Sequence, residues 1–488
     1  MTHLIYRSII SSCDKMQPIG LLYSYINNQL YSPSASILFS TQSKIPLHMK
    51  KLFVLPAILI LFVFAGCKKS DSVNTTTASV YTIAVLADNH YMDPSLLIQD
   101  GPAFQDYLVT DGKLLAASDA IMKEAIQELI QAKPDLVLVP GDLTKDGELV
   151  GNVSVHLYLQ QLIQAGIKVR VITGNHDIYN PHSFVYNGAT KTRVQNIGPD
   201  KFRSIYSDCG YSDALYTDPY SLSYVSEPLP NLWLIAIDCC KYDNLNDSIY
   251  TAGAIRPGTM KWILDRLAEA ARKGKTVFGM MHHGIVEQFT GKDKTFPGFM
   301  LDNFKDVSNQ LMNAGLKIMF TGHFHATDVT EQQSGNQFLY DIETGSIIVY
   351  PCSYRLITYI KDSALILTTK HISDVNYSDI APYQTFSQYA EGLTRTAVDT
   401  LFTTSLMTGK QISYNDTAWH ISHCMGTALM VHGYGDEDKG LEDTAFIGQT
   451  ARQYKASLWL PDYCDFLWTD KIPRDNSLTI LLKSGISY

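Results

Sequence analysis

Basic residues are scarce in this 488-residue chain, and they do not cluster. Lys and Arg number 39 against 48 Asp and Glu, which gives a formal net charge of -9 at pH 7. Outside a short segment near the N-terminus, no basic run is longer than Lys68-Lys69. Proteins that bind nucleic acid contact its phosphates through clustered Lys and Arg. The composition therefore argues against nucleic acid as the main partner, and we expect no nucleic-acid-binding patch.

Long apolar runs are also absent, since the one strongly apolar run, Leu52–Phe64, has only 13 residues. A helix that spans a bilayer needs about 20 apolar residues. The run follows Met49-Lys50-Lys51 and precedes Ala65-Gly66-Cys67, which are the charged start and the small residues before the cut of a secretory signal. Phe64-Ala-Gly-Cys67 resembles a bacterial lipobox, which implies that Cys67 is lipidated. A plain signal peptide is the alternative.

A signal peptide begins at the initiator Met, so Met49 is the expected start of the protein. Residues 1–48 would then be a mis-assigned upstream extension, and residues 49–67 the lipoprotein signal peptide. Residues 68–79 would form a polar tether, because Ser and Thr dominate them. We therefore expect an exported protein that its lipid anchors to a bacterial membrane, in the outer membrane or the periplasm.

Cysteine is sparse, and no two cysteines form a Cys-x-x-Cys pair. This absence argues against a structural zinc ribbon. Disulfides are permitted in an exported protein, but adjacent cysteines rarely bond to each other. We expect free buried thiols for most of the six cysteines beyond the signal region, which are Cys209, Cys239, Cys240, Cys352, Cys424 and Cys464.

From Val80 onwards the chain alternates between strand and helix patterns. Hydrophobic residues make up 45% of the chain and charged residues 18%, as in an ordinary globular protein. Helical spacing of apolar residues predicts helices at Leu114–Ala132, Val155–Ala165, Gly258–Lys273 and Phe304–Ala314. The predicted strands are Tyr81–Ala87, Asp135–Val139, Lys168–Ile172, Ser221–Tyr224, Leu232–Ile237, Thr276–Met281, Lys317–Phe320, Phe338–Ile342, Ser346–Val349 and Ile357–Ile360. This alternation predicts a sheet covered by helices, with the chemistry at the carboxyl ends of the strands.

Two segments depart from this alternation. Ile178–Tyr220 is a polar and aromatic insertion without a clear period, and we expect it to border a pocket. Beyond about Asp374 the pattern changes to polar helices at Phe386–Thr403 and Ala418–Val431, with a last strand at Ser477–Lys483. These residues form either a small helical addition or a cap.

Five short motifs of Asp, Asn and His follow the predicted strands. They are Asp88-Asn-His90, Gly141-Asp142, Gly174-Asn175-His176-Asp177, His282-His283 and Gly322-His323-Phe-His325. Each alone has an ordinary explanation, because a lone His at a strand end is usually a structural residue and Gly-Asp is usually a turn. Gly-His-x-His is more specific, since it places two imidazoles on the same side of an extended backbone. The ordered set indicates a shared site.

The ordered motifs resemble the calcineurin-like metallophosphoesterase superfamily, and the resemblance extends from about Val80 to Ile360. It implies an α/β fold of the α+β type, a four-layer α/β/β/α sandwich in which helices flank two mixed β-sheets. The domain would span residues 80–372, and residues 373–488 would form a mostly helical C-terminal extension of unknown role. The resemblance also implies an enzyme that hydrolyses phosphoric esters.

The family pattern distributes the motifs over two metal ions. One ion would be held by Asp88, His90, Asp142 and His325, and the other by Asp142, Asn175, His282 and His323. Two cations a few ångströms apart repel each other and need a shared carboxylate, for which Asp142 is the natural bridge. Imidazole and carboxylate ligands without thiolate favour divalent or trivalent Mn, Fe or Zn.

A metal-bridging hydroxide would be the nucleophile, because the ions lower the pKa of a bound water. His176 is not needed as a ligand, and we predict that it protonates the leaving group or stabilises the phosphoryl oxygens. Asp177 or a neighbour of Asp142 would orient it, although Asp177 could instead be a helix N-cap. Of the doubled histidines, His282 is the expected ligand, while His283 would face the pocket, support the site from behind or simply pack.

Tyr179, His283 and Arg355 are the candidates for contact with substrate, and His182 is a further candidate for the pocket lining. The alternatives are plain loop packing for Tyr179 and His182, and a surface or strand-pairing role for Arg355. The predicted function is metal-dependent hydrolysis of a phosphodiester or phosphomonoester, in a small molecule or lipid headgroup. The alternative is an inactive or ligand-binding surface lipoprotein on the same core, which would be expected to lack a ligating His or Asp.

Overall fold

The structure is a computed structural model that describes residues 78–109, 111–242, 250–409, 416–437, 467, 471 and 473–488. The expected upstream extension, the signal peptide with Cys67 and most of the tether lie outside the described residues, as does Cys464. All described residues belong to one unit of the chain, Ala78–Tyr488. Among them, no helix combines the length and the apolar character needed to cross a membrane.

The first sheet is built around β1, the strand that ends before Asp88. Its strands are β1 (Val80–Val85), β3 (Leu136–Val139), β4 (Lys168–Val171), β14 (Ser353–Ile360), β15 (Ala364–His371) and β16 (Ser477–Leu481). Their order is β16-β15-β14-β1-β3-β4. β1, β3 and β4 run parallel, whereas β14 is antiparallel to β1. The three parallel strands therefore end at the same edge of the sheet.

The second sheet holds the strands that precede the histidine motifs. Its strands are β7 (Tyr216–Thr217), β8 (Tyr224–Leu229), β9 (Leu232–Ile237), β10 (Thr276–Met281), β11 (Ile318–Thr321), β12 (Asp328–Ser334) and β13 (Gln337–Glu343). They follow the order β12-β13-β11-β10-β9-β8-β7. The four strands β9, β10, β11 and β13 are parallel, and the remaining pairs are antiparallel. Both large sheets are therefore mixed, as predicted.

The side chains of β9 show that the second sheet lies between two apolar layers. Leu234 and Ala236 belong to the core that includes residues of the first sheet. Trp233 and Ile235 point to the opposite face and pack in a second core. Successive residues of a strand face opposite sides, so a strand that is apolar at every position is buried on both faces.

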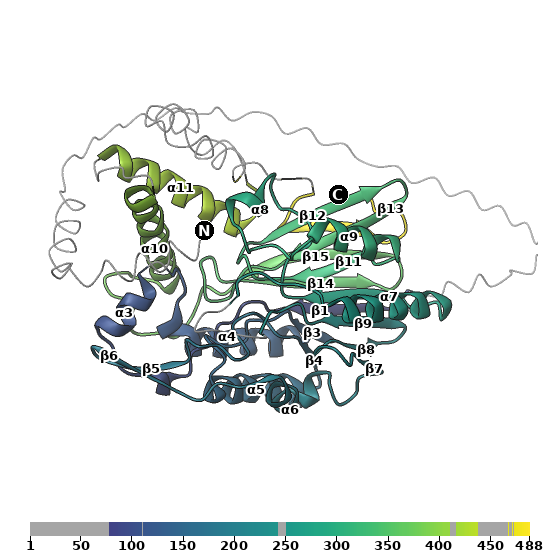
Figure 1. The fold of residues 1–488 in the computed structure, drawn as a ribbon, viewed down its shortest axis with the longest axis horizontal. Coiled ribbons are helices and arrows are strands. Elements are labelled where there is room, and N and C mark those ends of the chain that lie inside the picture. The colour runs from purple at the N-terminus through teal and green to yellow at the C-terminus, as the bar shows by residue number, and fades with distance from the viewer. Residues whose placement is uncertain are drawn as a thin grey trace, which may run out of the picture. The chain divides into compact units, whose positions relative to one another are not determined.

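Helices cover the outer faces of the two sheets (Figure 1). The first sheet is covered by α4 (Ser118–Ala132) and α5 (Leu149–Gln164), and the second by α7 (Pro257–Arg272) and α9 (Phe304–Asn313). The inner faces pack against each other, and the rings of Phe278 on β10 and Tyr359 on β14 are 5.2 Å apart. The predicted sandwich of helices around two mixed sheets is confirmed.

Shorter elements lie in the connections between these strands and helices. A small sheet has the order β2-β5-β6, and its strands are β2 (Leu97–Gln99), β5 (Phe184–Asn187) and β6 (Thr190–Arg193). The short helices are η2 (Pro94–Leu96), α3 (Pro102–Leu108), η3 (Leu115–Ala117), α6 (Pro199–Ile205), η4 (Ser207–Cys209) and α8 (Lys292–Thr295). The insertion 178–220 thus contains regular elements that are too short to show a period in the sequence.

The C-terminal part is helical, as predicted, but its last residues also complete the first sheet. α10 (Phe386–Gly409) and α11 (Asp416–Tyr434) pack on each other. β16 pairs antiparallel with β15, from Ala364 opposite Leu481 onwards. In addition, the hydroxyl of Tyr340 donates to the carbonyl of Gly485 at 2.7 Å. β16 is therefore an edge strand of the first sheet, and the C-terminal part is more than an appended cap.

Two predicted strands are wrong. Ser346–Val349 is a turn, in which the hydroxyl of Ser346 donates to the carbonyl of Asp88 at 2.7 Å. Ser221–Tyr224 is mostly loop, because β8 begins only at Tyr224. β12 and β15 were not predicted from the sequence, because their polar outer positions obscure their pattern.

Candidate metal centre

The five motifs meet at one end of the two sheets. Asp88 and His90 follow β1, Asp142 follows β3 and Asn175 follows β4, while the histidine motifs follow β10 and β11. The two sheets are joined here, because the backbone N–H of His323 donates to both carboxylate oxygens of Asp88 at 2.9 and 3.0 Å. The strand topology thus gathers ligands that are more than 230 positions apart in the chain.

One group of potential ligands consists of Asp88, His90 and His325, whose donor atoms lie within 4.8 Å of one another. The Nε2 atoms of His90 and His325 are 3.0 Å apart. Asp88 contributes Oδ1 at 3.7 Å from Nε2 of His325. Asp88 and His90 are buried, and the His325 side chain is 21% exposed. These are three of the four ligands predicted for the first ion.

A second group consists of Asp142, His282 and His323, again with donor atoms within 4.8 Å. Nε2 of His282 lies 3.1 Å from Nδ1 of His323 and 3.0 Å from Oδ1 of Asn175. The same Nε2 is 3.2 Å from Oδ2 of Asp142. The structure therefore brings together all four ligands predicted for the second ion.

Asp142 lies between the two groups. Its Oδ2 atom is 3.5 Å from Nε2 of His90 in the first group and 3.2 Å from Nε2 of His282 in the second. Its Oδ1 atom accepts a hydrogen bond from the backbone N–H of His176 at 2.8 Å. One carboxylate oxygen thus faces both histidine groups, which is the place that a bridging ligand requires.

The donor set fits metal ions. Burial holds the pKa values of His90, His323 and His325 well below their usual range, so these imidazoles are neutral and offer lone pairs. Pairs of ring nitrogens face each other at 3.0 and 3.1 Å. Neutral imidazoles with carboxylate and amide oxygens are the ligands of Zn, Fe and Mn.

The backbone at these positions is strained. Asp88, His90, Asp142, His323 and His325 have φ angles of 50°, 36°, 47°, 80° and 62°. Residues other than glycine rarely adopt positive φ, and such residues concentrate at functional sites, where the surrounding fold enforces them. Five of the seven predicted ligands share this feature, which supports their role as one constellation.

Two motif glycines make room for the site. A Cβ atom at Gly174 would lie 2.1 Å from Oδ1 of Asp142, and a Cβ atom at Gly322 would lie 2.3 Å from Oδ2 of Asp88. Both distances are far below van der Waals contact. Glycine is therefore required in Gly-Asn-His-Asp and Gly-His-x-His because the backbone passes directly against a ligating carboxylate.

His176 stands at the open side of the site. Its side chain is 14% exposed, and its ring packs edge-on against His90 with centroids 4.7 Å apart. Its Nδ1 atom is 2.8 Å from the carbonyl of Lys145 and 3.0 Å from Oδ1 of Asp146. Burial lowers the pKa of His176, but the charges of Asp142 and Asp146 outweigh this effect and raise it. These two contacts both engage Nδ1 and leave Nε2 as the other ring nitrogen.

The carboxylate that contacts the ring of His176 is that of Asp146, which agrees with the alternative that a neighbour of Asp142 orients this ring. Asp146 is buried and also accepts a hydrogen bond from Asn180 at 2.9 Å. Its Oδ2 atom forms an ion pair with the fully buried Lys145, which also pairs with Glu148 at 2.9 Å. The feature of the sequence that pointed to Asp146 is its position four residues after Asp142, in the same turn.

Asp177 has neither of the two roles predicted for it, which were to orient His176 and to cap a helix. Its Oδ1 atom accepts from the backbone N–H of Thr144 at 3.0 Å, and its Oδ2 atom accepts from the N–H of Gly174 at 2.8 Å. No helix starts after it, so it is not an N-cap. Asp177 is fully buried and ties the loop after β3 to the loop after β4. It therefore supports the site without reaching the reaction.

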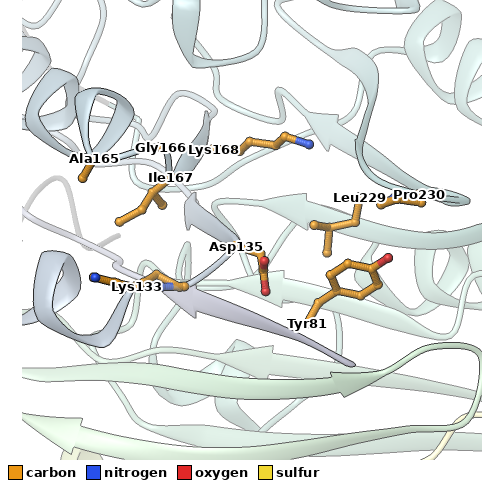
Figure 2. A pocket seen from close by; sticks show the side chains of 10 residues that line it. Tyr81, Lys133, Asp135, Ala165, Gly166, Ile167, Lys168, Leu229 and Pro230 are labelled. Atoms are coloured by element: carbon orange, nitrogen blue, oxygen red, sulfur yellow. The ribbon is translucent and has the colours of Figure 1, made fainter. Parts of the chain in front are cut away.

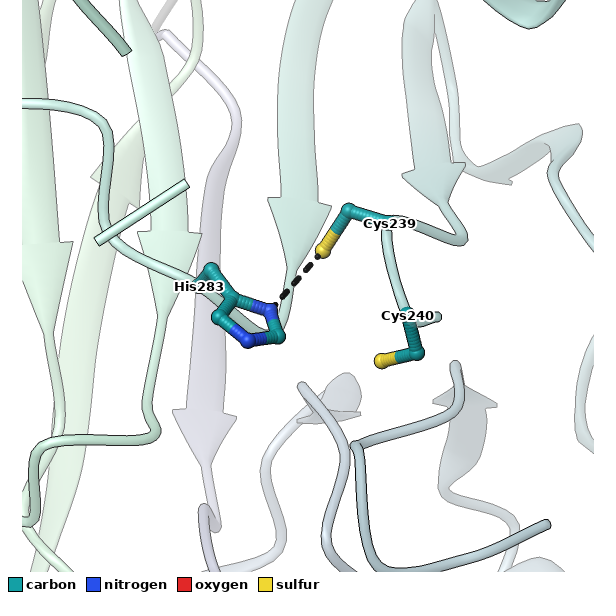
Figure 3. Close-up of side chains that lie close together, drawn as sticks. All are labelled: Cys239, Cys240 and His283. Atoms are coloured by element: carbon teal, nitrogen blue, oxygen red, sulfur yellow. Dashed lines mark hydrogen bonds between the residues drawn. The ribbon is translucent and has the colours of Figure 1, made fainter. Parts of the chain in front are cut away.

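His283 lies behind the metal ligands, away from solvent. Figure 3 shows its Nδ1 atom facing Sγ of Cys239, at 3.3 Å, with Cys240 alongside. Its Nε2 atom is 2.8 Å from the carbonyl of Thr251, and its ring is 4.1 Å from that of His323. The side chain is fully buried, so it supports His323 and does not line the pocket. Cys239 and Cys240 are free buried thiols, as expected.

Arg355 is not a substrate-binding residue. Its guanidinium is fully buried and donates to the backbone carbonyls of Glu343 at 2.6 Å, Asp475 at 2.6 Å and Asp328 at 3.2 Å. These bonds join β14 to β12, β13 and the C-terminal segment. The strand-related role, which the sequence left as the alternative, is the one that the structure supports.

The rim of the site is formed by the insertion after Asp177 and by an aromatic loop. Tyr179 and His182, both of this insertion, are exposed, and the exposed fraction of Tyr179 is 49%. On the opposite side, the ring of Phe299 lies 5.1 Å from His323 and 5.4 Å from Phe324. The site thus has a polar side at His176 and an apolar side at Phe299.

A separate pocket opens at the opposite ends of the same strands. Tyr81, Asp135 and Lys168 line it, together with the turn at Lys133 (Figure 2). These residues stand at the amino ends of β1, β3 and β4. In α/β sheets the chemistry collects at the carboxyl ends, so this pocket does not belong to the candidate metal centre.

Comparison with known proteins agrees with the motifs. No curated protein matches the chain. Among solved structures, a dimetal phosphatase from Danio rerio is 15% identical, with 60% of this chain and 96% of that chain covered and a TM-score of 0.43. A purple acid phosphatase from yellow lupin (Lupinus luteus) seeds is 13% identical, with 60% of this chain and 52% of that chain covered and a TM-score of 0.35. The sequence model of calcineurin-like phosphoesterases matches residues 81–327. Because this match spans just over half of the sequence, the chain belongs to the calcineurin-like phosphoesterase family.

Proposed function

We propose that this protein hydrolyses phosphomonoesters or phosphodiesters with a pair of metal ions, and that it does so as an exported protein held at a membrane by a lipid on Cys67. The observation that carries the catalytic part is the position of Asp142, whose Oδ2 atom faces His90 at 3.5 Å and His282 at 3.2 Å. A single-ion site needs no carboxylate between two separate histidine groups. The inactive alternative predicts a missing ligand, and every ligand of the pattern is in place.

The side chains divide the work of the reaction. Two ions bound by the two groups would supply Lewis acidity, which lowers the pKa of water and draws charge from phosphoryl oxygens. Nε2 of His176 would donate its proton to the departing alkoxide. Asp146 holds the opposite nitrogen of this ring at 3.0 Å and so fixes the direction of the donor. Asn175 offers a neutral oxygen, which would keep an ion in the second group strongly electrophilic.

The catalytic proposal is tested with the purified protein and two synthetic esters, p-nitrophenyl phosphate and bis-p-nitrophenyl phosphate. Activity is measured after removal of metal and after addition of Mn, Zn or Fe. We expect hydrolysis that depends on added metal and falls by about 10²- to 10³-fold in Asp142→Asn and His323→Ala, the usual loss when a charge-stabilising contact is removed. The control is His156→Gln, a partly exposed histidine on α5 that pairs with Asp208 at 2.7 Å. Unchanged rates in the two site variants would contradict the proposal.

The anchoring proposal is tested separately. The sequence Phe64-Ala-Gly-Cys67 supports lipidation, so the full-length protein is expected to partition into a detergent phase and Cys67→Ser to stay in the aqueous phase. Mass spectrometry of the expressed protein checks the expected start at Met49. Peptides from residues 9–44 would contradict that start, and equal partitioning of the two proteins would contradict the anchor.

A further inference from the structure

Lys113 is a buried cation beside the candidate metal centre that the motifs do not include. It lies in the loop between α3 and η3 and is 8% exposed. Its ammonium donates to Oδ2 of Asp111 at 3.2 Å, and its backbone N–H donates to Oδ1 of the same residue at 3.2 Å. An ammonium has three donors, and burial of such a charge is costly unless it serves a partner. One half-buried carboxylate satisfies only part of this demand.

The loop that carries Lys113 is attached to the backbone of Asp88. The N–H of Leu114 donates to the carbonyl of Ile348 at 2.7 Å. Ser346, two residues before Ile348, donates its hydroxyl to the carbonyl of Asp88 at 2.7 Å. From the other side, the hydroxyl of Thr394 on α10 donates to the carbonyl of Gly112 at 3.2 Å. The loop of Lys113 is thus held by α10 and connected, through the turn after β13, to the backbone of Asp88.

The carboxylates around Lys113 keep its ammonium charged. Although burial lowers its own pKa, the carboxylates of Asp111, Asp142 and Asp146 outweigh this and raise it. Lys113 therefore stays charged at neutral pH. The neighbouring buried Lys145 differs, because Asp146 and Glu148 engage it.

We propose that the ammonium of Lys113 is an anion-binding subsite, which contacts a phosphoryl oxygen of the substrate and favours phosphomonoester dianions over phosphodiester monoanions. The inference rests on the proposed phosphoesterase function and assigns its substrate class. A monoester carries one more negative charge than a diester at neutral pH. A fixed cation next to the reacting phosphate stabilises this additional charge, and the surrounding low dielectric strengthens the interaction.

The test compares Lys113→Met, which keeps the length and removes the charge, with Lys113→Arg, which keeps the charge. Lys123→Met, an exposed lysine on α4, is the matched control. We measure kcat/KM for p-nitrophenyl phosphate and bis-p-nitrophenyl phosphate, inhibition by inorganic phosphate and metal content. For Lys113→Met, kcat/KM for the monoester and phosphate affinity are expected to fall about 10- to 100-fold, the range for a hydrogen bond to a charged group. The kcat/KM for the diester should fall much less than that for the monoester. Lys113→Arg should recover much of the lost kcat/KM for the monoester, and the metal content of Lys113→Met should equal that of the wild type.

Three results would overturn the assignment: equal losses for both esters, a Lys113→Met variant that behaves like Lys123→Met, or loss of bound metal in Lys113→Met. The last result would show a role in forming the site. If the wild-type protein hydrolyses neither ester, the proposed function fails, and calorimetric titration of the metal-loaded protein with inorganic phosphate still decides about Lys113. Weaker binding by Lys113→Met then supports the subsite, while equal binding, or no binding by the wild type, overturns it.

Discussion

Asp146→Asn tests most directly whether Asp146 orients His176, because it changes none of the predicted metal ligands. The carboxylate of Asp146 meets four donors: Oδ1 accepts from His176 and Asn180 at 3.0 and 2.9 Å, and Oδ2 accepts from Lys145 and from Tyr107, the latter at 3.2 Å. An amide replaces one acceptor oxygen by a donor. Its NH₂ group would therefore face two donors, whichever way the side chain turns.

Two magnitudes follow from this geometry. A buried donor left without an acceptor costs about 1–3 kcal/mol, so the free energy of unfolding should fall by about 2–3 kcal/mol. Lys145 keeps Glu148 at 2.9 Å, which limits the loss. His176 keeps the carbonyl of Lys145 at 2.8 Å, so its ring stays near its position. We therefore expect kcat to fall about 10- to 100-fold, as for other residues that orient a site from behind, with little change in KM.

The assay is a double-mutant cycle with His176→Ala. If Asp146 acts through His176, then Asp146→Asn lowers kcat in the wild-type background and has almost no further effect in the His176→Ala background. Asp208→Asn is the control, because Asp208 holds His156 in the same way outside the site, at 2.7 Å. The same fold-loss of kcat in both backgrounds would refute the argument, since it would show that Asp146 acts independently of the ring.

Two further predictions concern the fold around the site. Gly322→Ala places a Cβ 2.3 Å from Oδ2 of Asp88, so it should abolish binding of one ion. The control Gly315→Ala, at an open position with φ of 93°, should leave the metal content unchanged. Mass spectrometric analysis of the bound metal distinguishes the two results. Burial raises the pKa of Glu437 to about 8 and lowers that of its partner His432 to about 4. The folded chain then binds more protons at Glu437 than the unfolded chain does. Below pH 6.5 the lowered pKa of His432 has the opposite effect, because there the unfolded chain binds more protons at His432; above pH 6.5, its ordinary pKa, this opposing effect ends. Stability should fall between about pH 6.5 and 8, by at most about 1.4 kcal/mol per pH unit. Denaturant unfolding should show this slope in the wild type, and its persistence in Glu437→Gln would contradict the assignment.

The part of the fold that depends on local pattern was predictable from the sequence. The strands at Leu232–Ile237 and Thr276–Met281 have the predicted bounds, because continuous apolar runs bounded by turns mark strands that are buried on both faces. The motifs meet as expected because parallel strands end at a common edge. By contrast, β16 joins β15 across more than 100 residues, a pairing that no local period encodes.

The candidate site was predictable only where a motif carried it. Asp146 and Lys113 lie in turns and loops, where charged residues are ordinary, and their roles arise from burial that only the assembled fold creates. Asp177 and His283 stand inside motifs, so the sequence left chemical and structural roles open for both, and only their contacts with supporting groups in the fold favour the structural ones. For Arg355 the sequence left a surface or strand-pairing role beside a substrate contact, and the complete burial between strands that decides between them is invisible in a half-polar sequence.

The central claim is that one carboxylate, that of Asp142, joins two metal ions. Electron paramagnetic resonance of the protein loaded with Mn(II) tests it directly, because two ions that share a bridging ligand show a spin-coupled spectrum. We expect two Mn ions per chain with a coupled signal in the wild type, and uncoupled or lost signals in Asp142→Ala. A fully active wild-type protein with one uncoupled Mn ion per chain would contradict the account.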